Sequence, residues 1–461
     1  MIVITIDQNR RTDSNFPSLE QTLENMSDFQ SSKRRQKLNL LQSVADAWIQ
    51  CEAARKKLMV SDGPYRGKII PFGPYCQGIN TKDEDNGVLL VTPKWISQKS
   101  FFFLFAEMLR FKESVEYVLC LKGHNLIRTK IAGIKFDIVL AKLHMNNVPG
   151  NFKISETTDA SLFIDFINEK RICGIINASF ILTMVYSKQV FKTALKTLKL
   201  WAKECGIFSN TLRYLNNFNL AIMTCRICQL FPMEPVERIV YHFFRIYSQW
   251  NWSEPILMNS SVLLQTSNIS NKYYRMPIDE EGPSKVNIFI RFGGKMNLLC
   301  RMIKDYGFKR MLDIMNRDHP WSYLFERKTF FHTYPYYFAI SFNCPNEQTF
   351  DMWCPVFKIY VRNRATLYEK KRNVDFVHVN CRAFDEAVDK DGQGCTKTWF
   401  IGIKFCGYPN YFDDIVDDKI HDCRVSIKSF KNFQITDYLP KELLPVSTES
   451  KEEKEGRNKI Y

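Results

Sequence analysis

Two aspartates, Asp85 and Asp137, are the residues whose type and setting best suit them to hold a metal ion. Gly73 follows a short apolar strand predicted at residues 68–72, and such a turn can bring backbone amides close to a triphosphate. Acidic residues on the next strand can then hold magnesium against that triphosphate. Asp85 stands at the required distance, but the residue two positions on, on the same strand face, is Gly87. The pattern therefore predicts a metal site that lacks one carboxylate.

Asp137 can supply another ligand to the same site. It lies between Phe136 and Ile138 in an otherwise apolar strand, where a carboxylate is costly to bury without a charge partner. A metal ion or a basic group is therefore expected near it, and a solvated strand edge is the alternative. Asp83 offers a competing register, because residues 83–85 also read Asp-Glu-Asp. It fits the spacing less well, and we interpret Asp83 and Glu84 as acids of a loop.

Basic residues give the 461-residue chain a formal net charge of +15, which favours a polyanionic partner such as nucleic acid. One group lies at helical spacing: Lys188, Lys192, Lys196, Lys199 and Lys203. Such a stripe is commonly a solvated helix face, but Lys199 lies near the turn at Gly206, where it can contact a phosphate. A second group can contact RNA phosphates or form a solvated face: Lys358, Arg362, Arg364, Lys370, Lys371 and Arg372.

Composition excludes several other classes of protein. The most apolar stretch, residues 101–109, contains Glu107 and is too short to cross a bilayer, so we expect no membrane span. The 14 cysteines show no repeated zinc-site pairs and follow no secretory signal, which favours reduced thiols in a nuclear or cytosolic protein. Cys225 and Cys228 form one Cys-x-x-Cys in a helical pattern. We interpret them as packed thiols rather than half of a metal site.

The elements that must position these residues suggest an α+β protein of several domains. Strands are predicted at residues 68–72, 88–91 and 133–140, with helices at 37–57 and 101–111. Helices are expected to dominate from about residue 155 to 325, at 189–205, 219–230 and 236–250. Further on, strands at 336–342, 374–379 and 398–405 and a helix across 350–361 predict a β-α-β arrangement.

With these residues in place, the chain resembles eukaryotic nuclear poly(A) polymerase across residues 35–440. The most specific stretch is LKLWAKECGIFSN at residues 198–210. It is followed in order by CRICQLFP at 225–232, HFFRIYSQWNW at 242–252, YRMPI at 274–278, WSYLF at 321–325 and TWFIGIKF at 398–405. Several independent matches in the same order make the resemblance specific.

The resemblance implies a polymerase-beta-like nucleotidyltransferase domain, a helical central domain and an RRM-like C-terminal domain that binds RNA. The implied boundaries are a flexible N-terminus at 1–20, these three domains at 21–170, 171–325 and 326–445, and a charged tail at 446–461. By resemblance, Asp85 and Asp137 match catalytic aspartates that bind Mg²⁺ or Mn²⁺. The implied ATP-binding residues are Gly73, Asn177, Lys199 and Phe208. RNA binding is assigned to Lys358, Arg362, Lys370, Lys371 and Arg372.

The departures from the family pattern fall where the chemistry is expected. The serine after the loop glycine is Pro74, which also removes a backbone donor, and the second aspartate is Gly87. Phe208 stands where a tyrosine is expected and keeps only the ring. The Gly-Gly-Val expected at residues 216–218 is Asn-Asn-Phe, which adds bulk. Losing one well-placed electrostatic group commonly costs about a hundredfold in rate.

Two functions follow from these departures. The first is transfer of AMP from ATP to an RNA 3′ end, with weak or lost activity. The second is an inactive relative that binds RNA or cleavage and polyadenylation factors. The resemblance implies a nuclear protein, and the short basic cluster KRRQK at residues 33–37 is compatible with a nuclear signal.

Overall fold

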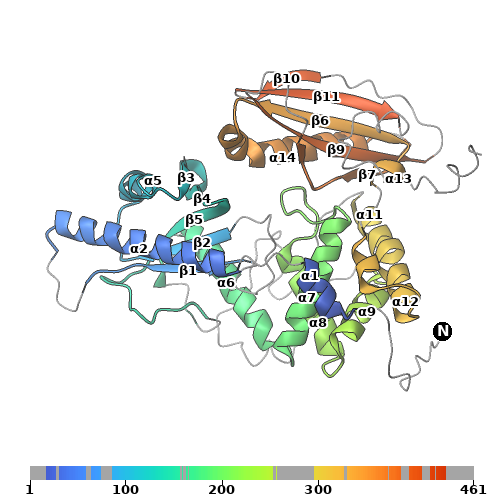
Figure 1. Ribbon diagram of the computed structural model, residues 1–461, viewed down its shortest axis with the longest axis horizontal. Coiled ribbons are helices and arrows are strands. Elements are labelled where there is room, and N and C mark those ends of the chain that lie inside the picture. The colour runs from blue at the N-terminus through green and yellow to red at the C-terminus, as the bar shows by residue number, and fades with distance from the viewer. Residues whose placement is uncertain are drawn as a thin grey trace, which may run out of the picture. The chain divides into compact units, whose positions relative to one another are not determined.

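A computed structural model describes residues 17–26, 31–58, 64–73, 86–155, 158, 162–164, 166–252, 256, 295–326, 330–371, 373–385, 394–406, 416–420 and 422–431. The chain divides into two compact units. The first comprises residues 1–203, 215–291 and 300–326, and the second comprises residues 204–214, 292–299 and 327–461. Each unit is described separately (Figure 1).

The first unit contains a five-stranded sheet with the order β1-β2-β5-β4-β3. Its strands are β1 (Lys68–Phe72), β2 (Asn86–Thr92), β3 (Val115–Leu121), β4 (Leu126–Ile131) and β5 (Ile134–Lys142). Strands β2 and β5 run parallel, and the other neighbours are antiparallel. The three strands predicted here are confirmed as β1, β2 and β5. The sequence prediction missed β3 and β4.

One face of this sheet packs against α2 (Ser31–Arg55), which begins six residues earlier than predicted. The helix predicted at 101–111 is a continuous run of α4 (Gln98–Ser100), the π-helical η1 (Phe101–Phe105) and α5 (Ala106–Arg110). Trp48 is fully buried between these elements and packs against Phe105 with tilted rings at a centroid distance of 5.2 Å. These large aromatic side chains make the core of this face.

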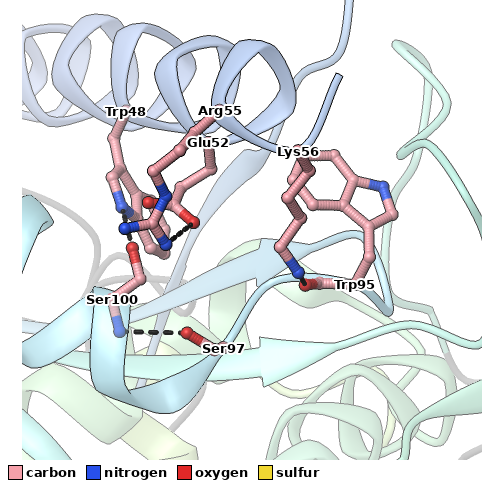
Figure 2. Close-up of polar contacts among 7 residues, drawn as sticks. All are labelled: Trp48, Glu52, Arg55, Lys56, Trp95, Ser97 and Ser100. Carbon is pink, nitrogen blue, oxygen red and sulfur yellow. Dashed lines mark hydrogen bonds and ion pairs between the residues drawn. The ribbon is translucent and has the colours of Figure 1, made fainter. Parts of the chain in front are cut away.

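Hydrogen bonds fix α2 against that helical run (Figure 2). The indole Nε1 of Trp48 donates to Oγ of Ser100 at 2.9 Å, and the backbone N of Ser100 donates to Oγ of Ser97 at 3.1 Å. Farther along, Lys56 Nζ donates to the carbonyl oxygen of Trp95 at 2.6 Å. The buried polar atom of the largest core side chain is thereby satisfied, and the face under α2 is held rigidly.

The helical part of the first unit follows the sheet in sequence. Its main helices are α6 (Phe166–Thr183), α7 (Lys188–Glu204), α8 (Asn217–Leu230) and α9 (Val236–Tyr247), and those predicted at 189–205, 219–230 and 236–250 are confirmed. It also contains α1 (Leu19–Met26), η4 (Met302–Phe308), α12 (Lys309–Met315) and η5 (Trp321–Phe325), with α11 (Lys295–Arg301) at the boundary of the units. Helix α1 begins inside the segment expected to be a flexible N-terminus.

Close aromatic packing holds these helices together. Trp201 on α7 contacts Phe244 on α9 edge to face at 4.8 Å, and its Nε1 donates to the carbonyl oxygen of Tyr306 at 3.2 Å. Cys225 and Cys228 are buried in α8, and burial raises the pKa of each thiol to about 12, which agrees with packed thiols. None of the helices that the structure describes is both long and apolar enough to cross a membrane.

The second unit contains a sheet with the order β10-β11-β6-β9-β7, with the short β8 (Phe384–Asp385) paired to β9. The strands are β6 (Tyr336–Cys344), β7 (Val374–Val379), β9 (Cys395–Phe405), β10 (Val416–Ile420) and β11 (Cys423–Lys431), preceded by α13 (Phe330–Thr333). Helix α14 (Glu347–Glu369) lies against one face of the sheet (Figure 1). Both β6 and β7 are antiparallel to β9 and therefore parallel to each other. The predicted β-α-β arrangement is confirmed, with β9 inserted between its two strands.

Candidate active site

The turn after β1 has the backbone geometry that the sequence predicted. Gly73 is exposed and has φ of +75°, in the left-handed region that favours glycine. Residues 74–85 lie outside the described residues, and so do the predictions for Pro74, Asp83, Glu84 and Asp85. The described part of the site begins again at β2, one residue before Gly87.

Gly87 and Asp137 lie on the same face of the first sheet. They are directly paired across the parallel strands β2 and β5, and Phe72 is paired with Gly87 from β1. A Cβ atom built on Gly87 would come within 2.6 Å of Cε2 and 2.7 Å of Cζ of the Phe72 ring. Phe72 itself packs against the hydrophobic cluster on this face, which includes Leu89 and Val139. An aromatic ring therefore fills the space into which a carboxylate at position 87 would extend.

Asp137 has a basic partner, which agrees with the prediction of a metal ion or a basic group near it. Nε of Arg128 contacts Oδ1 of Asp137 at 2.7 Å, and Nη2 contacts Oδ2 at 2.8 Å. The two residues face each other across the hairpin of β4 and β5. The Arg128 and Asp137 side chains are 11% and 21% exposed, so solvent screens this bidentate pair only partly.

The sequence held a signal for this pair that the strand assignment missed. Ala132 and Gly133 have φ of +46° and +79°, which is the signature of a two-residue type I′ hairpin turn. Such a turn pairs residues symmetrically around itself, so Arg128 must face Asp137. Interpreting residues 132–133 as a hairpin turn would have placed the guanidinium opposite the carboxylate.

Further charges surround the pair. Nζ of Lys130 lies 3.1 Å from Oε2 of Glu116, and the backbone N of Gly133 donates to the same carboxylate at 2.6 Å. Burial alone would raise the pKa of Glu116, but the Gly133 bond together with Lys130 and Lys135 lowers that pKa below its usual value. Asp137 is thus near three basic side chains, Arg128, Lys130 and Lys135, and one further acid, Glu116.

These residues do not fit a complete metal cage. Within the part of the chain that the structure describes, no group of three or more His, Cys, Asp or Glu side chains could hold an ion. Position 87 offers no ligand, and both carboxylate oxygens of Asp137 already accept bonds from Arg128. A cation at this face would depend on Asp137 and on acids outside the described residues.

Lys199 is fully buried on α7. In the same stripe, Lys192, Lys196 and Lys203 are half-buried and only Lys188 is exposed, so the stripe is not a solvated face. Burial lowers the pKa of Lys196, while the charge of Glu24 on α1 acts in the opposite direction. Contact between Lys199 and ATP phosphates stays a prediction. Asn177 lies within α6, and the structure does not describe its side chain.

Phe208 is half-buried in the segment of residues 204–214, which belongs to the second unit. Strand β7 anchors this segment. Nε2 of His378 donates to the carbonyl oxygen of Gly206 at 3.2 Å if Nδ1 accepts from Oη of Tyr334, which lies 2.7 Å from it. Oη of Tyr214 accepts from the backbone N of Val379 at 2.9 Å. The backbone on both sides of Phe208 is thereby held in place.

The bulky residues at 216–218 have a local structural role in the first unit. Asn216 is the N-cap of α8, and its side-chain oxygen accepts a hydrogen bond from the backbone N of Asn219 at 2.9 Å. Asparagine is one of the preferred N-cap residues because it satisfies an otherwise unpaired helix amide. The departure from Gly-Gly-Val therefore favours the start of this helix.

The basic residues predicted to bind RNA fall on or just after α14. Lys358 and Arg362 are half-buried, and Nη1 of Arg362 donates to the carbonyl oxygen of Thr211 at 3.2 Å. Burial, with the charge of Arg213, lowers the pKa of Arg362. Lys370 and Lys371 are exposed, and Arg372 lies outside the described residues. RNA binding by this group stays a prediction.

Comparison with known proteins identifies the scaffold. The family sequence model of the poly(A) polymerase nucleotidyltransferase domain matches residues 7–162, and the family sequence model of the poly(A) polymerase central domain matches residues 190–327. Together they cover more than half of the chain. The α+β fold class with a nucleotidyltransferase domain is therefore confirmed.

Curated relatives extend the match. Poly(A) polymerase PAPalpha of Candida albicans is 26% identical over 447 residues, which is 91% of this chain and 77% of the relative. Poly(A) polymerase pla1 of Schizosaccharomyces pombe is 28% identical over 375 residues, 77% of this chain and 65% of the relative. A structure of the Cid1 poly(U) polymerase has a TM-score of 0.41 at 15% identity and covers 67% of this chain and 98% of that one. The chain belongs to the poly(A) polymerase family.

Proposed function

We propose that this poly(A) polymerase-like chain binds an RNA 3′ end and ATP in mRNA 3′-end polyadenylation, and that it transfers AMP weakly or not at all. The observation that carries this proposal is the pairing of Gly87 with Asp137, with the Phe72 ring filling the space at position 87. Family membership supports the substrates, RNA and ATP, and nuclear localisation.

The proposal implies that this site binds divalent metal ions weakly. When bound, Mg²⁺ or Mn²⁺ in a nucleotidyltransferase neutralises the triphosphate and stabilises the developing charge. In this chain Asp137 and Asp85 would be the ligands. Lys199, Gly73 and Asn177 would contact the nucleotide, and the ring of Phe208 would stack on its base. Removing one ligand from such a cage lowers turnover at least about a hundredfold, because the metal ions supply most of the electrostatic stabilisation.

A second function is favoured by the same observation at Gly87. The scaffold would then act as a pseudoenzyme that binds RNA or cleavage and polyadenylation factors. Core residues such as Trp201 and Phe244 remain tightly packed, so the fold persists while the site changes. The exposed Lys370 and Lys371 would supply RNA phosphate contacts in either case.

Primer extension tests both functions. Purified protein is incubated with an oligo(A) primer and ATP, first with Mg²⁺ and then with Mn²⁺. The expected result is little or no extension by the natural chain, with primer binding retained. Because the Phe72 ring fills the space at position 87, Gly87→Asp is tested alone and with Phe72→Ala, and the double variant is expected to gain more. Extension by the natural chain that Asp85→Ala abolishes would refute the pseudoenzyme function, and efficient extension that neither position-87 variant improves would refute the proposed loss of activity.

A further inference from the structure

The ion pair between Arg128 and Asp137 uses both oxygens of the carboxylate. Each oxygen of the Asp137 carboxylate accepts one N–H of the planar guanidinium, at 2.7 Å and 2.8 Å. This two-bond geometry is specific to arginine and matches the spacing of carboxylate oxygens. Because both side chains are mostly buried, bulk water does not compete strongly for either of them.

The register of one hairpin places the two residues opposite each other. Arg128 and Asp137 are opposite each other in the antiparallel register of β4 and β5, and the turn at residues 132–133 fixes that register. Both residues and the turn between them are therefore part of one short hairpin. The guanidinium keeps its positive charge beside Asp137 at all physiological pH values, since arginine stays protonated.

The charges around the pair also oppose a second cation. Lys135 lies two residues before Asp137 on the same strand face, and Lys130 lies two residues after Arg128 on the neighbouring strand. Glu116 offsets Lys130 through the ion pair between them. A divalent ion at Asp137 would have to approach Arg128 and Lys135 while the carboxylate that attracts it is already neutralised.

We propose that the Arg128 guanidinium takes the place of the divalent cation at Asp137, so that Arg128 sets the low metal affinity of this site. The inference rests on the proposed function, and it names the residue that keeps metal away from the one acid that the described site retains. Gly87 removes a ligand, whereas Arg128 blocks a ligand that is still present. The two effects are separable, because Arg128 lies on β4 and does not contact position 87 through the backbone register.

Manganese titration of the full chain, followed by electron paramagnetic resonance of free Mn²⁺ without nucleotide, tests the proposal. The variants are Arg128→Gln and Arg128→Gln with Asp137→Asn. The control is Lys135→Gln, which removes one positive charge from the same face but leaves the pair. The expected result is at least tenfold tighter Mn²⁺ binding for Arg128→Gln, less than threefold tighter for Lys135→Gln, and loss of the gain in the double variant.

Arg128→Lys is the second variant in case the glutamine variant does not fold, as judged by circular dichroism. Lysine keeps the charge but lacks the two-bond fork, and a smaller gain of about threefold is expected. Equal Mn²⁺ affinity in the natural chain and in the soluble Arg128 variants would overturn the inference, and so would a gain that survives Asp137→Asn. Efficient primer extension by the natural chain would overturn the proposed function instead, so the two failures are distinguishable.

Discussion

Replacing Asp137 by Asn should destabilise this protein, and the sign of the effect is informative. An aspartate kept only to bind a metal is stabilised little in the empty site, so its neutralisation leaves stability unchanged or raises it. Here Asp137 is paired with Arg128, so the amide variant removes the carboxylate charge and one of the two hydrogen-bond acceptors that a mostly buried guanidinium has at position 137. The structure therefore predicts a loss of stability.

The geometry gives the size of that loss. Two unit charges at 4 Å attract by about 4 kcal/mol at an effective dielectric constant of about 20. Side-chain exposures of 11% and 21% and the desolvation of both ions reduce the net contribution. We expect about 2 kcal/mol, which corresponds to a fall in Tm of roughly 3 °C for a unit of this size.

Thermal and urea unfolding of Asp137→Asn, Arg128→Gln and the double variant measure the free energy of the Arg128–Asp137 ion pair as a double-mutant cycle. The expected coupling between the two positions is about 2 kcal/mol, so that the double variant is hardly less stable than either single one. Asp305→Asn is the control, because Asp305 pairs with Lys309 at 3.1 Å on an exposed helix face and should cost less than about 0.5 kcal/mol. An unchanged or raised Tm for Asp137→Asn would refute the reasoning.

Two further predictions concern the helical part of the first unit. Burial, with two nearby arginines, lowers the pKa of His242 to about 4, below its unfolded value of 6.5. The neutral form of His242 therefore adds to the free energy of unfolding above pH 6.5, and this stabilisation is lost as the pH falls towards 4. The loss of stability amounts to about 3 kcal/mol. In His242→Phe, which keeps a ring stacked on Phe231 at 3.8 Å, the stability measured by urea unfolding should not show this fall with pH. Asn216→Ala should lower the free energy of unfolding by about 1 kcal/mol because it removes the side chain that caps the Asn219 amide. Asn216→Asp keeps a capping oxygen and should change the stability little. Equal losses for the two variants in thermal unfolding would contradict this prediction.

Periodicity predicted most of the elements that build the site. Strand β1 was predicted with the residues it has, and the bounds of β2, α7 and α8 differ from the predicted ones by at most two residues. Strand β4 was missed although Ile127, Thr129 and Ile131 alternate as buried residues with polar ones between them. The charged residues between them, Arg128 and Lys130, weaken the apolar pattern, and the hairpin turn that identifies the strand was not used.

Burial of the site residues was harder to predict than their secondary structure. The lysines of α7 are spaced as a stripe, but spacing alone does not show what packs on it, and Lys199 is fully buried. Likewise, a glycine at position 87 predicts a missing ligand, whereas the Phe72 ring that fills the space is visible only in the register of β1 and β2. Both features depend on partners distant in sequence.

The two faces of the first sheet show why the fold can persist without an intact metal site. On one face, Trp48 and Phe105 pack beneath α2 and contribute burial that is independent of any ion. On the other face, a carboxylate intended for a metal would repel neighbouring acids in the empty protein. Arg128 removes that cost, since it converts Asp137 from an unpaired acid into half of an ion pair. The same contact that stabilises the empty site therefore opposes metal binding, so stability and catalysis place opposite demands on Arg128.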